Sequence, residues 1–471
     1  MTDHYGIVSA GEWSTSGSGF DSAWATLSGG TIKMEPPTAE DVAFLDANTP
    51  DYFATDLESA GQFCRRLDMG PNYYTYAFAA TFTVDADIDI GGDETDLTRL
   101  GGTIEGAASL YIGTSVEFLP GVDFSGYEVP LILDCLGPAT LTTNGVTLPP
   151  ISLYGYLEAV DPATMTDFEM VAGSGYNDGG QAHTVLGDLT IVGSTGSEFV
   201  STGTWALAGS GIVWMSSLLM FAKVIAGAGG GVVSTFTSNI HVRAFGYGSG
   251  TVTADTDEYL EVRPSADDFW TSGAGTVSLP SVRIVLSASR WQAGAIRLSN
   301  VTTLMVFPYY MTSGDFTLTA GTIDVAASIL WVYAPSAGRN MTLAITGDLA
   351  CGAVKLGDSA AYGTGKIAFG TGTHAIAGLQ KYASDGPAGS VCDFGSASIT
   401  LTGVSPSIDG GAATPIAFRN TAGKVHGGTL TNLAVDAGDN ALIAFQSTHG
   451  SGNSNVTRSQ VLAHHHGRMS A

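Results

Sequence analysis

Residues 82–96 read FTVDADIDIGGDETD, and this stretch separates two interpretations of the whole chain. Apolar residues alternate here with three aspartates, so the carboxylates are either ligands of a calcium loop or the solvated side of a β-strand. An EF-type calcium loop needs Gly at position 6 and Glu at position 12. Counted from Asp85, those positions hold Ile90 and Asp96. Because the alternation is the one that a half-buried strand requires, the stretch predicts a strand.

Short alternating segments of the same kind recur along the chain and end in Gly, Asn, Asp or Ser, as strands separated by turns do. In the second half, such segments open with Gly at six places, which are Gly275, Gly314, Gly347, Gly372, Gly395 and Gly427. Their spacing is irregular but mostly close to one solenoid repeat of about 20–50 residues. A parallel β-helix tolerates this irregularity because loops of any length can leave the coil between strands.

We therefore predict an all-β fold, a right-handed parallel β-helix (β-solenoid) with a small N-terminal attachment segment. The predicted parts are an attachment segment at 1–66, a β-helix body at 67–445 and a polar C-terminal tail at 446–471. Tandem β-sandwiches are the alternative, because a period of two residues is common to both architectures.

Two stretches depart from the simple strand pattern. The best candidate for a helix is residues 36–48, PPTAEDVAFLDAN, where Thr38 could cap a first turn that contains Glu40 and Asp41. The second stretch is apolar and covers residues 211–233, GIVWMSSLLMFAKVIAGAGGGVV. Serines, Lys223 and glycines interrupt it. A membrane-spanning helix needs about 20 predominantly apolar residues, so we predict successive buried strands for 211–233.

The composition excludes several classes of function. The chain has 471 residues, of which 44 are acidic and 18 basic, giving a formal charge of −26. Nucleic acid and anionic membrane surfaces are bound mainly through Lys and Arg, so neither is an expected partner, and no membrane insertion is expected. Hydrophobic residues make up 44% of the chain, which is enough for a large core.

The cysteines and the N-terminus bear on where the protein is made. Four widely spaced cysteines are too few for a disulfide framework, and we expect buried thiols at Cys64, Cys135, Cys351 and Cys392. The N-terminal MTDHYGIVSAGEW has neither a basic region nor an apolar core of the secretory type. We therefore expect a protein without a signal peptide that is made in a cytoplasm.

The N-terminal third resembles Gly/Thr-rich parallel β-helix proteins found among phage structural proteins and bacterial surface proteins. The likeness is carried by GEWSTSGSGFDSAWATLSGGTIKMEPPTAEDVAFLDANTP at residues 11–50 and by the strand-turn unit TLTTNGVTL at 140–148. The matching positions are Trp13, Trp24, Pro37, Thr38, Ala39, Glu40, Asp41, Asp46–Asn48, Cys64 and Leu67–Asp68. The resemblance implies a right-handed parallel β-helix and a virion or surface role, and it implies no catalytic residues.

From this resemblance we expect a non-enzymatic bacteriophage virion structural protein, a fibre, spike or capsid decoration subunit on head or tail. It would be assembled in the host cytoplasm, form a homotrimer and contact other virion proteins of the capsid or tail, with no cofactor. Attachment to a host-surface glycan is an additional candidate role. The alternatives are a tailspike-type polysaccharide depolymerase and a bacterial surface adhesin.

The main candidates for a binding site come from one acidic and aromatic stretch, TADTDEYLEVRPSADDFW at residues 253–270. Glycoside hydrolysis needs two carboxylates across a groove, and no pattern in the sequence places such a pair, so no catalytic residue is assigned. The candidate residues for binding a glycan or a partner are Tyr259, Asp267, Asp268, Trp270, Tyr309 and Tyr310. No metal site is assigned: a polar tail or a contact with a neighbouring subunit is the favoured interpretation of His464 and His466, and metal ligation by this pair is the alternative.

Overall fold

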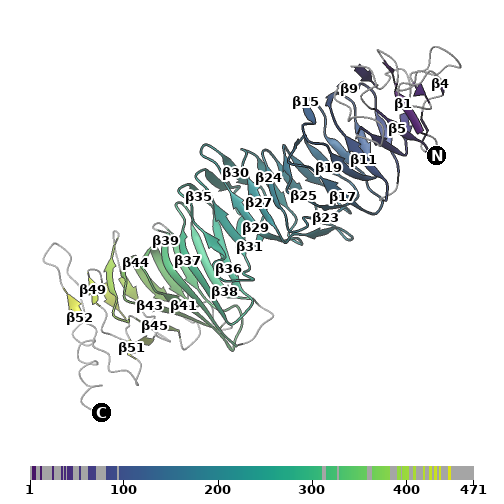
Figure 1. The fold of residues 1–471 in the computed structure, drawn as a ribbon. Coiled ribbons are helices and arrows are strands. Elements are labelled where there is room, and N and C mark those ends of the chain that lie inside the picture. The colour runs from purple at the N-terminus through teal and green to yellow at the C-terminus, as the bar shows by residue number, and fades with distance from the viewer. Residues whose placement is uncertain are drawn as a thin grey trace. The chain divides into compact units, whose positions relative to one another are not determined.

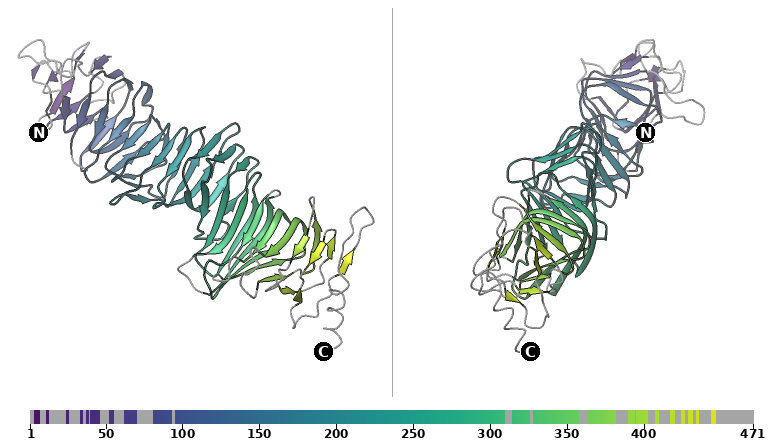
Figure 2. Two further views of the ribbon diagram at one scale, coloured as in Figure 1. Left: turned by 180° about the vertical axis from the view of Figure 1, so that it is seen from behind. Right: turned by 90° about the vertical axis from the view of Figure 1, so that its left-hand side faces the viewer.

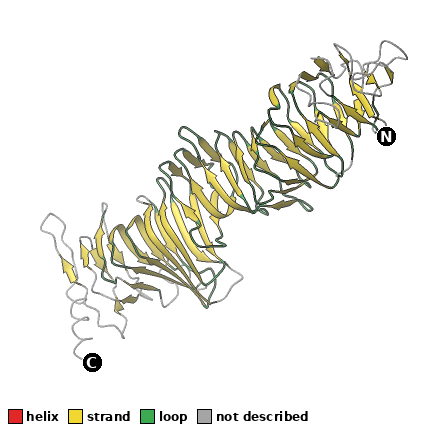
Figure 3. Ribbon diagram, in the orientation of Figure 1, coloured by secondary structure: helices red, strands yellow, loops and turns green. Residues whose placement is uncertain are grey.

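The structure is a computed structural model of the chain, and it describes residues 95–309 without a gap. Shorter described segments lie on either side: 3–6, 11–12, 24–25, 33–34, 37–38, 40–45, 52–54, 62–69, 81–92, 314–325, 328–357, 363–381, 390–393, 395–402, 407–409, 417–419, 424–426, 429–431, 434–435 and 444–446. All regular elements within these segments are β-strands, and none is a helix (Figure 3).

The chain divides into two compact units, Met1–Lys223 and Val224–Ala471. Both are parallel β-solenoids, and together they hold about 14 turns. Neighbouring strands in a sheet come from successive coils and run parallel; among the named strands, only the pairs β1–β3 and β3–β4 are antiparallel. The predicted all-β solenoid is confirmed and the alternative of tandem sandwiches is wrong. The predicted boundaries after residues 66 and 445 stay predictions.

In the first unit, each coil contributes one strand to each of three faces (Figure 1). The first face holds β1 (Asp3–Gly6), β5 (Val42–Phe44), β8 (Arg66–Asp68), β11 (Leu97–Leu100), β14 (Ser115–Phe118), β17 (Pro138–Thr142), β20 (Tyr156–Ala159), β23 (Gly175–Asn177) and β26 (Glu198–Val200), with β3 (Trp24–Ala25) and β4 (Lys33–Met34) beside β1. The second face holds β7 (Gln62–Cys64), β10 (Ile88–Ile90), β13 (Leu110–Ile112), β16 (Leu131–Leu133), β19 (Ile151–Leu153), β22 (Phe168–Met170), β25 (Leu189–Ile191) and β28 (Ile212–Met215).

The third face of the first unit is made by two separate groups of strands. The first group is β2 (Gly11–Glu12), β6 (Tyr52–Ala54), β9 (Thr81–Val84), β12 (Thr103–Gly106) and β15 (Asp123–Tyr127). The second group is β18 (Thr147–Leu148), β21 (Thr164–Met165), β24 (Ala182–Val185) and β27 (Thr204–Leu207). β15 and β18 are not paired, although the coils that contain them are paired on the other two faces. β29 (Phe221–Ala226) contains the division between the units.

The second unit is also built of parallel strands that lie side by side in successive coils (Figures 1 and 2), but some of its strands are long enough to pair with two strands of the next coil, as β39 does with β41 and β42. Its strands are β30 (Val233–Phe236), β31 (Ile240–Tyr247), β32 (Thr251–Ala254), β33 (Tyr259–Val262), β34 (Trp270–Thr271), β35 (Thr276–Ser278), β36 (Ser281–Leu286), β37 (Arg290–Arg297), β38 (Thr303–Pro308), β39 (Gly314–Val325), β40 (Ile329–Val332), β41 (Arg339–Ile345), β42 (Leu349–Leu356), β43 (Thr364–Phe369), β44 (Thr373–Lys381), β45 (Val391–Asp393), β46 (Ser398–Leu401), β47 (Ser407–Asp409), β48 (Ala417–Arg419), β49 (Lys424–His426), β50 (Thr429–Thr431), β51 (Ala434–Val435) and β52 (Ala444–Gln446).

The core of each unit is built from columns of inward apolar side chains, one from each coil. Pairing without a shift places every member directly over the residue of the coil before it. On the second face of the first unit the column is Ile90, Ile112, Leu133, Leu153, Met170, Ile191 and Met215. In the second unit, one column is Val282, Leu304, Leu330, Val354 and Leu379. All are at most 1% exposed, and each burial stabilises the fold by about 1.5–3 kcal/mol.

The aspartate-rich stretch forms a corner of the coil as well as a strand. Residues 88–90 form β10, with Ile88 and Ile90 buried and Asp89 exposed, so the predicted solvated strand is confirmed there. The strand does not continue back through Ala86, where the chain bends between β9 and β10. The bend is needed because the two strands belong to different faces. Asp87 stabilises the corner by accepting a hydrogen bond from the Ser109 backbone N–H of the next coil (2.7 Å).

The helix predicted at 36–48 is wrong for the residues that the structure describes there. Thr38 donates to the Asp41 carboxylate from both its backbone N–H (3.2 Å) and its hydroxyl (2.7 Å), and this closes a turn rather than a helix. The next residues form β5, which pairs with a strand on each side. Val42, Ala43 and Phe44 are all buried, because this strand lies between two coils. Tertiary pairing therefore overrides the weak helical pattern.

The prediction of buried thiols is confirmed, and the prediction for residues 211–233 is confirmed in part. All four cysteines are free and buried, and burial raises the pKa of the Cys135 and Cys351 thiols to about 12. The apolar stretch 211–233 contains β28 and β29 and begins β30, so its strands are confirmed, but they are half-buried rather than buried, and Ile212, Leu218 and Val233 are exposed. Each of the openings predicted from Gly275 to Gly427 leads into a strand.

A tight contact between coils requires glycine at position 209. A Cβ atom added there would overlap the backbone oxygen of Leu186, in the preceding coil. We predict that Gly209→Ala destabilises the first unit by about 2–3 kcal/mol or more, because the backbone of one coil must move away from the other. Gly294→Ala is the control, since an added Cβ at 294 meets nothing within 4 Å. Thermal unfolding of both variants checks this, and equal melting temperatures would contradict it.

A buried carboxylate holds together a corner of the first unit. Asp178 is fully buried and accepts hydrogen bonds from the backbone N–H groups of Gly180 (2.9 Å), Thr202 (2.9 Å) and Gly203 (3.0 Å). The indole Nε1 of Trp205 donates to it as well (3.3 Å). Burial acts to raise the pKa of Asp178, but the backbone donors outweigh burial and the pKa is lower than usual. The ionised carboxylate therefore stabilises the folded state.

This carboxylate predicts a defined loss of stability in acid. The folded-state pKa of Asp178 lies below the unfolded value of about 3.9, so its contribution is present above pH 4 and is lost as pH falls further. We expect Asp178→Asn to lower stability at pH 7 by about 2 kcal/mol and to reduce the additional loss between pH 5 and pH 3. Unfolding measured across that pH range is the test, with Glu198→Gln as the control, because Glu198 is an exposed acid on β26. An unchanged acid slope would contradict the assignment.

Candidate functional site

Two of the predicted binding residues lie on one outer surface of the second unit. Tyr259 begins β33 and Tyr309 follows β38, and both rings are half-buried. The guanidinium of Arg283 lies 3.5 Å from the centre of the Tyr259 ring, and that of Arg263 lies 5.3 Å from the centre of the Tyr309 ring. These cation–π contacts fix the orientation of both tyrosines.

Three other predicted residues lie apart from this surface, on the chain between β33 and the end of β34. Trp270 is 4% exposed, packs 5.1 Å from the Phe245 ring and donates from Nε1 to the Ser272 hydroxyl (3.0 Å). Asp267 is exposed, and its carboxylate accepts the backbone N–H of Gln292 from the next coil (2.7 Å). Asp268 is exposed and has a left-handed backbone, with φ of 57°. Trp270 and Asp267 therefore hold the chain between β33 and β34 against neighbouring strands of the second unit.

The remaining candidates lie outside the described residues. These are Tyr310 and the two histidines of the C-terminal segment, His464 and His466. Within the part of the chain that the structure describes, no group of three or more His, Cys, Asp or Glu side chains is placed to hold a metal ion.

The surface that carries Tyr259 and Tyr309 extends over four successive strands, β33, β36, β38 and β40. We call it the aromatic face and define it as Tyr259, Arg263, Arg283, Met305, Phe307, Tyr309, Trp331 and Tyr333, all half-buried. Its alignment follows from register, because Arg283 pairs with Met305 and Met305 with Trp331 on neighbouring coils. The inward residues between them are the core column of Val282 and its partners.

Three rings form a continuous stack on the aromatic face. Phe307 and Tyr333 lie 5.0 Å apart with a 30° angle between their planes, and Trp331 and Tyr333 lie 4.5 Å apart at 25°. Trp331 donates from Nε1 to the backbone oxygen of Gly357 (2.7 Å), which fixes the indole. Rings with centres this close face one another, so the stack forms a platform that presents mainly ring edges, against which an apolar or saccharide surface can pack.

One acidic group, Glu261, lies beside the aromatic face and is held by two neighbours. Arg263 donates to it from Nε, and His241 Nδ1 lies 3.4 Å from the same Oε1 atom. Burial acts to raise the pKa of Glu261, but the polar contact with His241 and the charge of Arg263 outweigh it, so the pKa is lower than usual. Glu261 is therefore ionised and orients Arg263.

Sequence reasoning missed most of the aromatic face, although a signal was present. In TLMVFPY (303–309) and ILWVY (329–333), large apolar residues occupy both sides of the alternation. Leu304, Val306 and Leu330 are buried, so the other set must point outward. Outward Met, Phe, Trp and Tyr residues on adjacent strands are the pattern that identifies such a surface.

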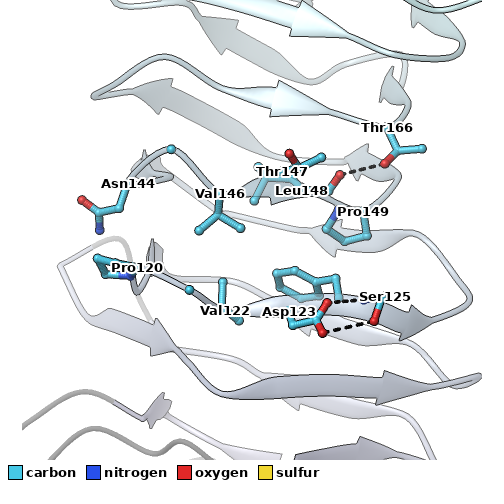
Figure 4. A pocket seen from close by; sticks show the side chains of 13 residues that line it. Pro120, Val122, Asp123, Ser125, Asn144, Val146, Thr147, Leu148, Pro149 and Thr166 are labelled. Carbon is cyan, nitrogen blue, oxygen red and sulfur yellow. Dashed lines mark hydrogen bonds between the residues drawn. The ribbon is translucent and has the colours of Figure 1, made fainter.

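The first unit contains a different kind of surface, a slot where β15 and β18 fail to pair. It has a volume of about 480 Å³, within the range of ligand pockets, and is formed by Pro120–Ser125 of one coil, Asn144–Pro149 of the next, and Thr166 (Figure 4). We call it the interstrand slot. None of the predicted binding residues lies in it.

The two units differ strongly in charge. Residues 1–223 contain five Lys or Arg residues against 29 Asp or Glu residues, whereas residues 224–471 contain 13 against 15. Between Arg99 and Lys223 there is no basic residue at all, and there are 12 acidic ones. The interstrand slot therefore lies in an entirely anionic part of the chain, whereas the aromatic face belongs to a nearly balanced unit.

Comparisons with protein-family models, with curated proteins and with solved structures found no match to this chain. The predicted resemblance to phage β-helix proteins is thus supported at the level of the fold alone, by the parallel solenoid. No helix in the described segments is long and apolar enough to cross a membrane.

Proposed function

We propose that the protein is a non-enzymatic structural subunit of a fibre, spike or decoration of a phage particle, and that the aromatic face attaches it to a host-surface glycan. The observation that carries the adhesive role is the ordered stack of Phe307, Tyr333 and Trp331 on the outside of a solenoid. The coils position the aromatic face, and the aromatic face is the surface that contacts the glycan.

The solenoid supports a structural role because its strands are joined coil to coil. Parallel ladders use the main-chain hydrogen bonds of most strands, which leaves few exposed edges for aggregation. Stability then comes from repeated nearest-neighbour contacts and needs no disulfide. This arrangement suits a subunit that must persist outside a cell after assembly inside one.

The aromatic face supports glycan attachment through its geometry. Tyr333 stacks with both Phe307 and Trp331, and the C–H groups of a saccharide can pack against the edges that such a stack presents. The stacked arginines place N–H donors beside the rings, where hydroxyl or carboxylate oxygens of a sugar can accept hydrogen bonds.

The candidate carboxylates have structural partners, which supports binding over hydrolysis. Glu261 is held by Arg263 and His241, and Asp267 accepts a backbone N–H of the next coil. A glycosidase needs one carboxyl group as an acid and another as a nucleophile or base across the scissile bond. We therefore propose that Asp267 and Glu261 serve the fold and that the sugar is retained unchanged.

We predict that the purified protein binds at least one bacterial surface polysaccharide in an array and that Trp331→Ala weakens this binding about tenfold. Loss of the indole removes one ring of the platform and its packing area, an effect of about 1.4 kcal/mol. Trp291→Ala is the matched control, because Trp291 is a half-buried tryptophan on β37, outside the aromatic face. Unfolding temperatures of both variants establish that each is folded.

Two results would contradict the proposal. If Trp291→Ala weakened polysaccharide binding as much as Trp331→Ala, the aromatic face would not be the contact surface. If the bound polysaccharide released reducing ends and Glu261→Gln stopped the release, the protein would be a depolymerase.

A further inference from the structure

The interstrand slot arises because one ladder of the first unit stops and restarts. β15 is the last strand of its group and β18 the first of the next, so each presents one edge without a neighbouring strand. Two features explain the break. The register between β12 and β15 shifts within Thr103–Glu105, and β18 is followed by Pro149 and Pro150, which have no N–H to donate.

The main chain on both sides of the slot is oriented to accept a strand. The N–H of Asp123 bonds to the backbone oxygen of Gly102, the residue before β12, so the N–H of the next residue, Phe124, is directed to the opposite edge, toward the slot. The carbonyl of Leu148 accepts from Thr166 in the next coil, so the N–H and C=O of Thr147 are likewise directed toward the slot. The two edges run parallel.

The slot combines an apolar floor with a polar, acidic rim. Val122, Phe124, Val146 and Leu148 are buried, at 9% exposure or less, and line its base. Asp123 lies exposed at the rim (Figure 4), where its carboxylate accepts the backbone N–H of Ser125 (2.9 Å) and the Ser125 hydroxyl (3.1 Å). These neutral donors leave the negative charge of Asp123 uncompensated.

We propose that the interstrand slot binds an extended basic segment of a partner protein, which adds a strand between β15 and β18. The segment would place an apolar side chain over Val122 and Val146 and a Lys or Arg beside Asp123. Main-chain pairing provides affinity in such β-augmentation, and the alternating side chains provide selectivity. The slot is lined by six residues of each coil, 120–125 and 144–149, which match a peptide of five or six residues, since a strand advances about 3.3 Å per residue. Only Asp123–Ser125 and Thr147–Leu148 of these segments are strand, so main-chain pairing would be centred on Phe124 and Thr147.

The negative charge of the chain around the interstrand slot determines that a basic peptide, rather than an acidic one, binds there. No basic residue occurs between Arg99 and Lys223, so nothing in this part of the sequence opposes a cationic ligand, and 12 acidic residues attract one. An acidic segment of the same shape would meet repulsion from Asp123 and its neighbours. The proposal is independent of the aromatic face and of any glycan bound there.

The test uses the full chain and two capped peptides of identical alternation, acetyl-KVKVK-amide and acetyl-EVEVE-amide. We expect the Lys peptide to bind, the Glu peptide to bind at least about tenfold more weakly, and Asp123→Lys to reduce Lys-peptide binding about tenfold. Glu198→Lys is the matched control, because Glu198 is an exposed acid on β26, on another face of the same unit. Isothermal titration calorimetry at 0.15 M salt measures binding of both peptides to the unchanged chain and of the Lys peptide to each variant.

Hydrogen exchange distinguishes strand addition from non-specific attraction. Bound Lys peptide should slow amide exchange at Phe124 and Thr147 in the full chain and leave the other two faces unchanged. The proposal is overturned if neither peptide binds, if Glu198→Lys weakens binding as much as Asp123→Lys, or if binding leaves exchange at the slot unaltered.

Discussion

The structure depends on the parallel ladders that join each coil to the one before it. A shift of one residue in any ladder would turn the inward column outward, so register is constrained wherever the core is filled. The same constraint requires glycine where coils approach most closely, as at Gly209, and a satisfied carboxylate where a corner is buried, as at Asp178. It also gives the aromatic face its order, because residues 22–26 positions apart are aligned in space.

Much of this fold could be predicted from the sequence, because alternation with Gly-rich turns survives in nearly every coil. The errors have local causes. DVAFL was assigned to a helix because a short segment buried on both sides has no period that distinguishes helix from strand. The corner at Asp85–Asp87 was missed because alternation continues across the bend, with Ile88 and Ile90 still inward. Periodicity does not reveal the division after Lys223 either.

The candidate sites were less predictable, since they depend on contacts between coils. Tyr259 and Tyr309 were identified as aromatic residues, but their partners Arg283 and Arg263 follow only from register. Trp270 carried the same composition signal and lies in the core beside Phe245. The interstrand slot depends on a strand pair that does not form, and its only sequence signal is Pro149–Pro150. The charge difference between the units, in contrast, can be counted from the sequence.

The central claim, a structural role on a phage particle with attachment through the second unit, is tested most directly by antibody-gold labelling of whole particles in the electron microscope. We predict label on the particle, on the capsid if the protein is a decoration or head fibre and at the tail if it is a tail fibre or spike. Unlabelled particles beside labelled bacterial surfaces would contradict the claim and identify a cellular adhesin instead.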